Sequence, residues 1–239
     1  MSDKIAVITG AGKGIGRATA LRFAEAGFDL ALFTRTEADY DSLRPQLEKA
    51  KVSFLTYSGD IADQATVADF AERTLERFDR VDYVVNNAGV YLKVDLKDSK
   101  VEDFDRVMAV NLRGSYLMAR AFVGRMVEQG DGVMLFVSSL AGLNGFPGGS
   151  IYCASKFAMQ GLAESLMLEV RKQGVRVCTV CPGNVRTNMW ESEPEPRPLS
   201  ETIIQPEDVA ESIYHACTMP ANSMVAQIQM RSTNMRMPE

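Results

Sequence analysis

A tyrosine and a lysine four positions apart are the first residues whose types and spacing could do chemistry. Tyr152 and Lys156 lie in a stretch with helical spacing, which puts both side chains on one face, one turn apart. An ammonium beside a phenol favours the phenolate, so the pair predicts a tyrosine pKa lowered from about 10 towards the working pH. Tyr152 would then donate a proton in carbonyl reduction and accept one in alcohol oxidation. The spacing alone also occurs by chance in many helices.

Ser139 is the residue most suited to act together with Tyr152. Ser139 comes just after the apolar run from Val133 to Val137, at the carboxyl end of a predicted strand. Open α/β sheets bind their ligands at that end. The Ser139 hydroxyl could therefore hold a substrate oxygen against Tyr152. Ser138 is predicted to face away, because neighbours in an extended segment alternate.

A glycine-rich turn follows the first predicted strand and opens the first helix. Glycines let the chain turn sharply and let its backbone approach a pyrophosphate at a helix N-terminus. This context, between a strand and a helix, supports a dinucleotide site. Its predicted cofactor-binding residues are Gly10, Gly12, Lys13, Gly14, Ile15 and Gly16.

The end of the second predicted strand indicates which dinucleotide is bound. An acidic residue there normally binds the ribose 2′-hydroxyl of NAD. Here Thr34 takes its place, Arg35 follows, and Lys13 adds a second cation nearby. These cations would attract a 2′-phosphate, so the sequence predicts NADP(H). The alternative is that both are solvated surface charges.

The elements that must position these residues alternate along the chain. Short apolar runs separated by helical patterns indicate a parallel sheet covered on both faces. We expect a Rossmann-type α/β fold, a doubly wound parallel sheet of seven strands, as one domain over residues 1–239. Helices are predicted at 17–26, 40–50, 63–78 and 152–170, and strands at 5–8, 30–33, 52–57, 81–85, 133–137 and 175–180. An acidic, proline-rich stretch suggests a short substrate flap near 188–205.

Composition excludes several classes of function. The formal net charge is -5 and no dense run of basic residues is present, so no nucleic acid partner is expected. The apolar runs are too short to cross a membrane and the first residues have no targeting pattern, which predicts a cytoplasmic protein. Cys178 and Cys181 have redox spacing but fall in a strand, where their sulfurs point apart. No cluster has metal-ligand spacing, and the single histidine, His215, is expected to be a structural or surface residue.

Taken together, these motifs resemble the short-chain dehydrogenase/reductase family over nearly the whole chain. The resemblance rests on the glycine turn, the block 86–89, Asn111, Ser139 thirteen residues before Tyr152, and Pro182 with Gly183. It implies hydride transfer to or from a nicotinamide and a catalytic tetrad of Asn111, Ser139, Tyr152 and Lys156, with the asparagine keeping a water in line with the lysine. It also implies further cofactor contacts from Asp60, Ile61, Asn87, Ala88, Gly89, Tyr152, Lys156, Pro182, Gly183, Val185 and Thr187.

The substrate remains open at the level of sequence. The family layout implies a small aromatic and apolar pocket walled by Tyr91, Leu143, Phe146, Met189 and Trp190. The chain ending and the segments 150–153 and 188–190 look similar to bacterial sepiapterin reductases. We therefore expect a small carbonyl or alcohol substrate. The alternatives are a 3-oxoacyl-carrier-protein reductase, which would need a basic docking patch, and a non-catalytic NADP(H)-binding sensor, which could lose the tyrosine or lysine.

Two predicted helices carry more apolar residues than one buried face needs. One covers residues 152–170 and includes Leu166, and the other leads from Asn111 to Val127 and includes Phe122. Surplus apolar surface on adjacent helices favours a partner that packs on both. Members of the family commonly pair through these helices, so we expect a homodimer or a homotetramer.

Overall fold

The computed structural model of the protein describes residues 4–187, 189 and 203–233, and it holds one seven-stranded parallel sheet. The strand order β3-β2-β1-β4-β5-β6-β7 confirms the predicted doubly wound fold. The strands are β1 (Ile5–Thr9), β2 (Asp29–Thr34), β3 (Phe54–Ser58), β4 (Tyr83–Asn86), β5 (Gly132–Val137), β6 (Val175–Pro182) and β7 (Gln227–Met230).

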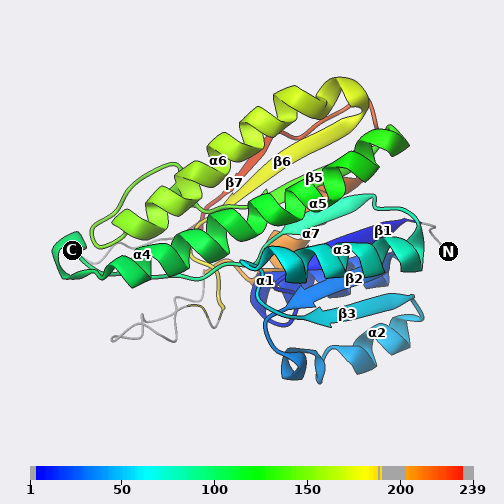
Figure 1. The fold of residues 1–239 in the computed structure, drawn as a ribbon, viewed down its shortest axis with the longest axis horizontal. Helices are drawn as coiled ribbons and strands as arrows, with labels where there is room; N and C mark the ends of the chain where they lie inside the picture. The colour runs from blue at the N-terminus through cyan, green and yellow to red at the C-terminus, as the bar shows by residue number, and fades with distance from the viewer. Residues whose placement is uncertain (1–3, 188, 190–202, 234–239) are drawn as a thin grey trace.

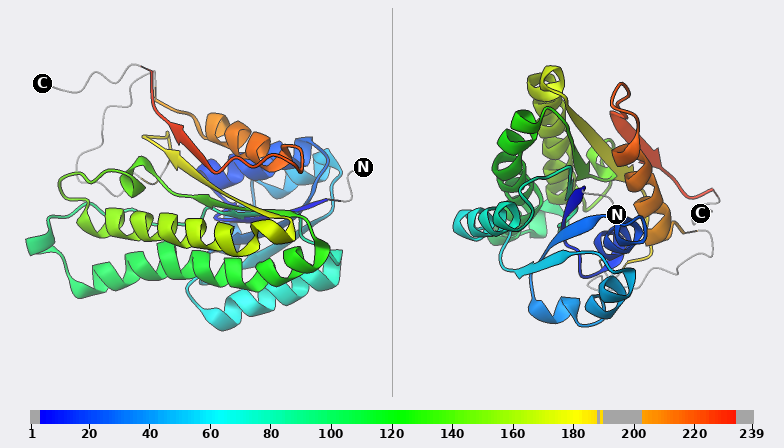
Figure 2. Two further views of the ribbon diagram at one scale, coloured as in Figure 1. Left: turned by 90° about the horizontal axis from the view of Figure 1, so that it is seen from above. Right: turned by 90° about the vertical axis from the view of Figure 1, so that its right-hand side faces the viewer.

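Helices cover both faces of the sheet (Figures 1 and 2). One face is covered by α1 (Gly14–Glu25), α2 (Arg44–Ala50) and α7 (Pro206–Thr218). The other face carries α3 (Gln64–Phe78), α5 (Gly114–Gln129) and α6 (Ser150–Val170). A shorter helix, α4 (Val101–Met108), runs through residues 109–113 into α5 (Figure 1). Each face buries its own apolar core, which explains why the central strands are apolar at consecutive positions.

The position of the site follows from the strand order. The chain runs outward from β1 to β3 and then crosses back to form β4 on the other side of β1. The connections after β1 and β4 therefore leave on opposite faces, which opens a crevice at the carboxyl ends of these two strands. The glycine turn follows β1, and residues 87–89 follow β4.

The segment after β2 differs from its predicted form. A continuous helix over residues 40–50 was expected, but the chain forms a short 3-10 helix, Glu37–Tyr40, and α2 begins only at Arg44. The reason is Tyr40, whose ring is fully buried and whose hydroxyl donates to the Leu32 carbonyl oxygen at 2.7 Å. This anchor fixes residues 37–40 against the carboxyl half of β2. Most of the predicted flap, namely 188 and 190–202, lies outside the described residues.

Candidate functional site

The glycine turn between β1 and α1 is shaped so that little else than glycine fits. Gly10 and Gly14 have φ angles of 66° and 52°, a region that L side chains rarely adopt. A Cβ at Gly16 would lie 2.2 Å from the carbonyl oxygen of Gly10. The turn is therefore tight, and its backbone is bare at the N-terminus of α1. This geometry fits the pyrophosphate of a dinucleotide.

Threonine and asparagine side chains tie this turn to the segment after β4. The Thr9 hydroxyl oxygen accepts hydrogen bonds from the backbone amides of Asn87 and Ala88, both at 3.0 Å. In return the Asn87 side-chain amide donates to the Thr9 carbonyl oxygen at 2.9 Å. Thr9 is not among the site residues predicted from the sequence. Its place directly before Gly10 was the signal that could have found it.

The end of β6 closes the site from the other side. Pro182 is the last residue of β6, and the Gly183 amide donates to the Met230 carbonyl oxygen of β7 at 2.9 Å. Beyond it, Val185 is buried and forms a bridge with Ile204. Thr187 lies against the glycine turn, because a Cβ at Gly14 would come within 2.9 Å of the Thr187 methyl carbon.

Residues expected at the adenine end follow β3. The Asp60 carboxylate accepts a hydrogen bond from the Ala62 amide at 2.9 Å, which fixes this turn. Ile61 is buried against Gly114, where a Cβ would lie 2.9 Å from an Ile61 methyl carbon. Both residues sit beside the carboxyl ends of the strands, and Asp60 is exposed there.

The two predicted phosphate-binding cations lie close to Asp39, an acid that was not among the predicted site residues. Arg35 is exposed directly after β2. The Lys13 ammonium lies 3.0 Å from a carboxylate oxygen of Asp39. Asp39 reaches this position only because residues 37–40 form a short 3-10 helix, a detail that no spacing in the sequence indicated.

The structure brings the predicted tetrad together. Tyr152 and Lys156 lie in the first turns of α6 and are only 7% and 4% exposed, with the lysine nitrogen 5.8 Å from the centre of the tyrosine ring. The Lys156 ammonium donates to the Val137 carbonyl oxygen at 2.9 Å. Ser139, two residues after the end of β5, donates to the Pro182 carbonyl oxygen at 3.4 Å, and its hydroxyl lies near enough to Tyr152 to lower the pKa of the phenol. The Ser138 hydroxyl instead donates to the Lys156 carbonyl oxygen at 3.3 Å, away from the phenol.

The prediction that the pKa of Tyr152 is lowered is wrong: the surroundings of the phenol raise it. Burial raises the pKa of Tyr152 to about 12, although the hydrogen bond with Ser139 opposes the rise. Burial also lowers the pKa of Lys156, to about 8. Desolvation is the largest cause of both shifts, so both groups are protonated for the most part at pH 7. That form suits a proton donor.

Asn111 is held where the long helix changes its winding. Residues Ala109–Arg113 form a π-helical turn between α4 and α5, a feature often found at functional sites. The fully buried Asn111 side chain accepts from the Val90 amide at 2.8 Å and donates to the Ser155 hydroxyl at 3.0 Å. A Cβ at Gly89 would lie 3.2 Å from Asn111 Oδ1 and 3.7 Å from Lys156 Nζ. The asparagine, the lysine and the segment after β4 therefore meet at one point.

An aromatic wall, formed by Tyr91 and Phe146, lies beside the Tyr152 phenol. The Tyr91 ring packs edge-on against Tyr152, with ring centres 5.0 Å apart and planes at 73°. Tyr91 and Phe146, both half-buried, pack on a small cluster of Ala141, Tyr152 and Cys153. Leu143 is half-buried in the same loop, and Met189 is 37% exposed with its amide donating to the Thr187 hydroxyl at 3.4 Å. Trp190 lies outside the described residues.

Other sequence expectations concern residues away from this site. The four cysteines are buried free thiols, and His215 is an exposed residue of α7 whose ring nitrogen lies 3.0 Å from Glu211. Within residues 4–187, 189 and 203–233, no group of three or more His, Cys, Asp or Glu side chains is placed to hold a metal ion. The helices of that part of the chain are also too short or too polar to span a membrane.

Comparison with known proteins gives a consistent result. The sequence pattern of the family described as short chain dehydrogenase matches residues 4–198. Sepiapterin reductase from Chlorobaculum tepidum is 38% identical over 237 residues, 96% of each chain. Alcohol dehydrogenase from the archaeon Thermococcus sibiricus, solved with 5-hydroxy-NADP, superposes with a TM-score of 0.90 at 30% identity over 99% of each chain. A short chain dehydrogenase from Mycobacterium paratuberculosis bound to NAD gives 0.87 at 28% identity over 96% of each chain.

Proposed function

The chain belongs to the short-chain dehydrogenase family, and we propose that it is an NADP(H)-dependent oxidoreductase that reduces a small carbonyl compound with Tyr152 as general acid. The observation that carries the proposal is the cluster of the half-buried Ser139 with the buried Tyr152 and Lys156 at the carboxyl end of β5, next to Asn111 and beside the glycine turn. A sensor that only binds the cofactor would not need this cluster.

The roles of the side chains follow from their protonation states. Bound NADPH supplies the hydride that reduces the carbonyl carbon. The hydroxyl groups of Ser139 and Tyr152 bind the carbonyl oxygen, and Tyr152 gives it a proton as negative charge develops there. With a pKa of about 12, the tyrosine carries its proton at neutral pH. The Lys156 ammonium, one turn along α6, stabilises the phenolate that the transfer leaves behind.

The cofactor preference rests on the charges at the end of β2. Thr34 is buried there, and its hydroxyl donates to the Thr36 carbonyl oxygen at 2.9 Å. Arg35 and Lys13 supply the cations for a 2′-phosphate, and an acid that would bind the ribose hydroxyls of NAD does not stand at position 34. We expect kcat/KM to be at least tenfold higher with NADPH than with NADH, on the order of 1.4 kcal/mol or more.

The aromatic wall and the relatives point to the substrate class. Tyr91, Phe146 and Leu143 offer rings and apolar carbon rather than charge, which suits a small planar or apolar carbonyl compound. The relative from Chlorobaculum tepidum carries the name sepiapterin reductase. Sepiapterin, a diketone or a similar compound is therefore the proposed substrate. A cytoplasmic location belongs to the same proposal and agrees with the four free thiols.

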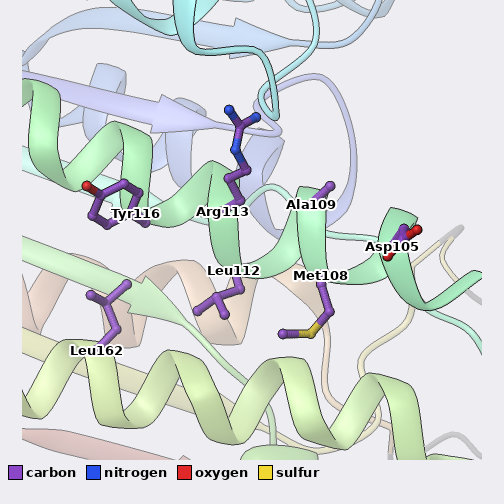
Figure 3. A pocket seen from close by; sticks show the side chains of 7 residues that line it. All are labelled: Asp105, Met108, Ala109, Leu112, Arg113, Tyr116 and Leu162. Carbon is purple, nitrogen blue, oxygen red and sulfur yellow. The ribbon is translucent and has the colours of Figure 1, made fainter.

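A second copy of the chain is the proposed partner. A pocket of about 510 Å³ lies between the α4–α5 helix and α6, and Figure 3 shows Met108 and Leu112 pointing towards α6 with Leu162 pointing back. Tyr116, which lines this pocket, is 47% exposed, and Leu168 of α6 is 56% exposed. Apolar side chains exposed on two adjacent helices favour a symmetric dimer that buries more than ~1,200 Å².

The expectation that Phe122 contributes to this apolar surface is wrong. Phe122 is fully buried in the core formed by α3, α5, α6 and the sheet, so it is not part of the surplus apolar surface. Leu166 is half-buried. The exposed residues of α5 and α6, rather than Phe122, are the ones to change in a test of assembly.

A substrate panel tests the proposed activity. The enzyme would be mixed with aldehydes, ketones, diketones and pterins in the presence of NADPH or NADH, and oxidation of the cofactor followed by absorbance. We expect turnover with at least one class of carbonyl compound and at least a tenfold higher kcat/KM with NADPH than with NADH. Binding of NADPH without turnover of any of these classes would contradict the proposed carbonyl reduction.

A further inference from the structure

Asp39 places a negative charge inside the proposed 2′-phosphate site. Its carboxylate lies 3.0 Å from the ammonium of Lys13, one of the two cations proposed to bind the phosphate. The Asp39 side chain is 18% exposed, whereas that of Lys13 is 69% exposed. The acid is thus the fixed member of the pair, and the lysine is the member that can move.

Three contacts hold Asp39 in place. The Thr36 hydroxyl donates to its second carboxylate oxygen at 2.7 Å. The next residue, Tyr40, is fully buried and anchors the segment to β2. Asp39 also lies directly against the glycine turn, because a Cβ at Gly12 would come within 2.4 Å of the Asp39 Cβ. The Asp39 carboxylate is therefore a fixed part of the wall of the cofactor site and not a freely moving surface side chain.

The carboxylate is ionised at neutral pH. Burial raises the pKa of Asp39, but the hydrogen bonds from Thr36 and Lys13 and the charges of Lys13 and Arg35 outweigh it, so that the pKa lies below its ordinary value of 3.8. Both proposed phosphate-binding cations are therefore near enough to act on this acid. Conversely, the acid reduces the positive potential that those cations offer to a phosphate.

We propose that Asp39 is a specificity-determining residue of the cofactor site, which pairs with Lys13 and thereby limits the preference for NADP(H) over NAD(H). A 2′-phosphate must compete with Asp39 for the lysine, and it approaches against the carboxylate's charge. NAD(H) lacks this phosphate and gains nothing from Lys13 when the pair opens. The inference rests on the proposed function, because it concerns the same cofactor site. Solved relatives bind NADP derivatives or NAD on the same fold, so selectivity must depend on local residues of this kind.

The test removes the charge and keeps the shape. Asp39→Asn retains an acceptor for the Thr36 hydroxyl, and Lys13→Gln and the double variant complete a cycle. Asp41→Asn is the matched control, because it removes one negative charge from an exposed residue two positions further along. Dissociation constants of NADP⁺, NAD⁺, 2′,5′-ADP and 5′-AMP would be measured by calorimetry, which does not depend on turnover.

We expect Asp39→Asn to tighten NADP⁺ and 2′,5′-ADP by about three- to fivefold, the range of a partly exposed ion pair, with NAD⁺ and 5′-AMP unchanged. In the Lys13→Gln background this gain should shrink below about twofold, and Asp41→Asn should change no constant by as much. Weaker binding of NADP⁺ by Asp39→Asn, an equal gain for NAD⁺, or an undiminished gain without Lys13 would overturn the inference while leaving the proposed function intact. Failure of the parent protein to bind either dinucleotide would overturn both.

Discussion

Replacing Lys156 by methionine should make the protein more stable while it abolishes turnover. Lys156 is only 4% exposed, and burial lowers the pKa of its ammonium from 10.5 to about 8. At about 1.4 kcal/mol for each pKa unit, the buried charge costs roughly 3 kcal/mol of folding free energy below pH 8. Methionine has a similar length and no charge. It loses the hydrogen bond to the Val137 carbonyl oxygen, which offsets about 1 kcal/mol. We expect a net gain of about 2 kcal/mol at pH 7.

The pH dependence separates this cause from improved packing. Because the lysine pKa is lower in the folded than in the unfolded protein, the unfolded chain binds more protons, and the stability of the parent rises between pH 8 and 10.5. The advantage of Lys156→Met should therefore disappear over that range. Urea unfolding at equal protein concentrations, from pH 7 to 10.5, measures both quantities. The exposed Lys172→Met is the control and should stay within about 0.5 kcal/mol of the parent. A variant less stable than the parent at pH 7, or an advantage that ignores pH, would refute the reasoning.

Three further predictions follow from the same structure. Carbonyl reduction should be constant near pH 7 and decline as the pH rises through about 8, because Lys156 then loses its proton; a pH–rate profile that rises above pH 8 would contradict this. Gly16→Ala should weaken NADPH binding at least tenfold in a titration of the folded variant, since the new Cβ would lie 2.2 Å from the Gly10 carbonyl oxygen; unchanged affinity would show that the turn can relax. Glutamates at Tyr116 and Leu168 should turn a dimer into a monomer by light scattering at ~10 µM, whereas a monomeric parent would refute the proposed assembly.

The sequence was sufficient for the fold, and for the proximity of Ser139, Tyr152 and Lys156, because both depend on short-range patterns. Apolar runs that alternate with helical stretches indicate a parallel sheet covered on both faces, even where the exact first and last residues of each strand are not known. The spacing of Tyr152 and Lys156 fixes one helix face, and the place of Ser139 after a strand fixes one sheet edge. The structure places all three side chains together, as the spacing required.

Properties that depend on packing between distant segments could not be predicted. The tyrosine pKa was expected to fall because the neighbouring charge is visible in the sequence, whereas the burial that raises it to about 12 is not. Asp39 meets Lys13 only because Tyr40 turns inward and shortens the expected helix. Phe122 was grouped with the apolar residues that exceed one buried face, because the pattern of an apolar helix alone does not reveal which stripe faces the sheet.

Exchange of Tyr152 for phenylalanine tests the central claim most directly. The ring would still pack against Tyr91, so the variant should bind NADPH within about threefold of the parent in a fluorescence titration. Its kcat for the best carbonyl substrate should fall by about 100-fold or more, because no proton is available for the substrate oxygen. A variant that binds NADPH normally and keeps more than roughly a tenth of the parent kcat would show that another group supplies the proton.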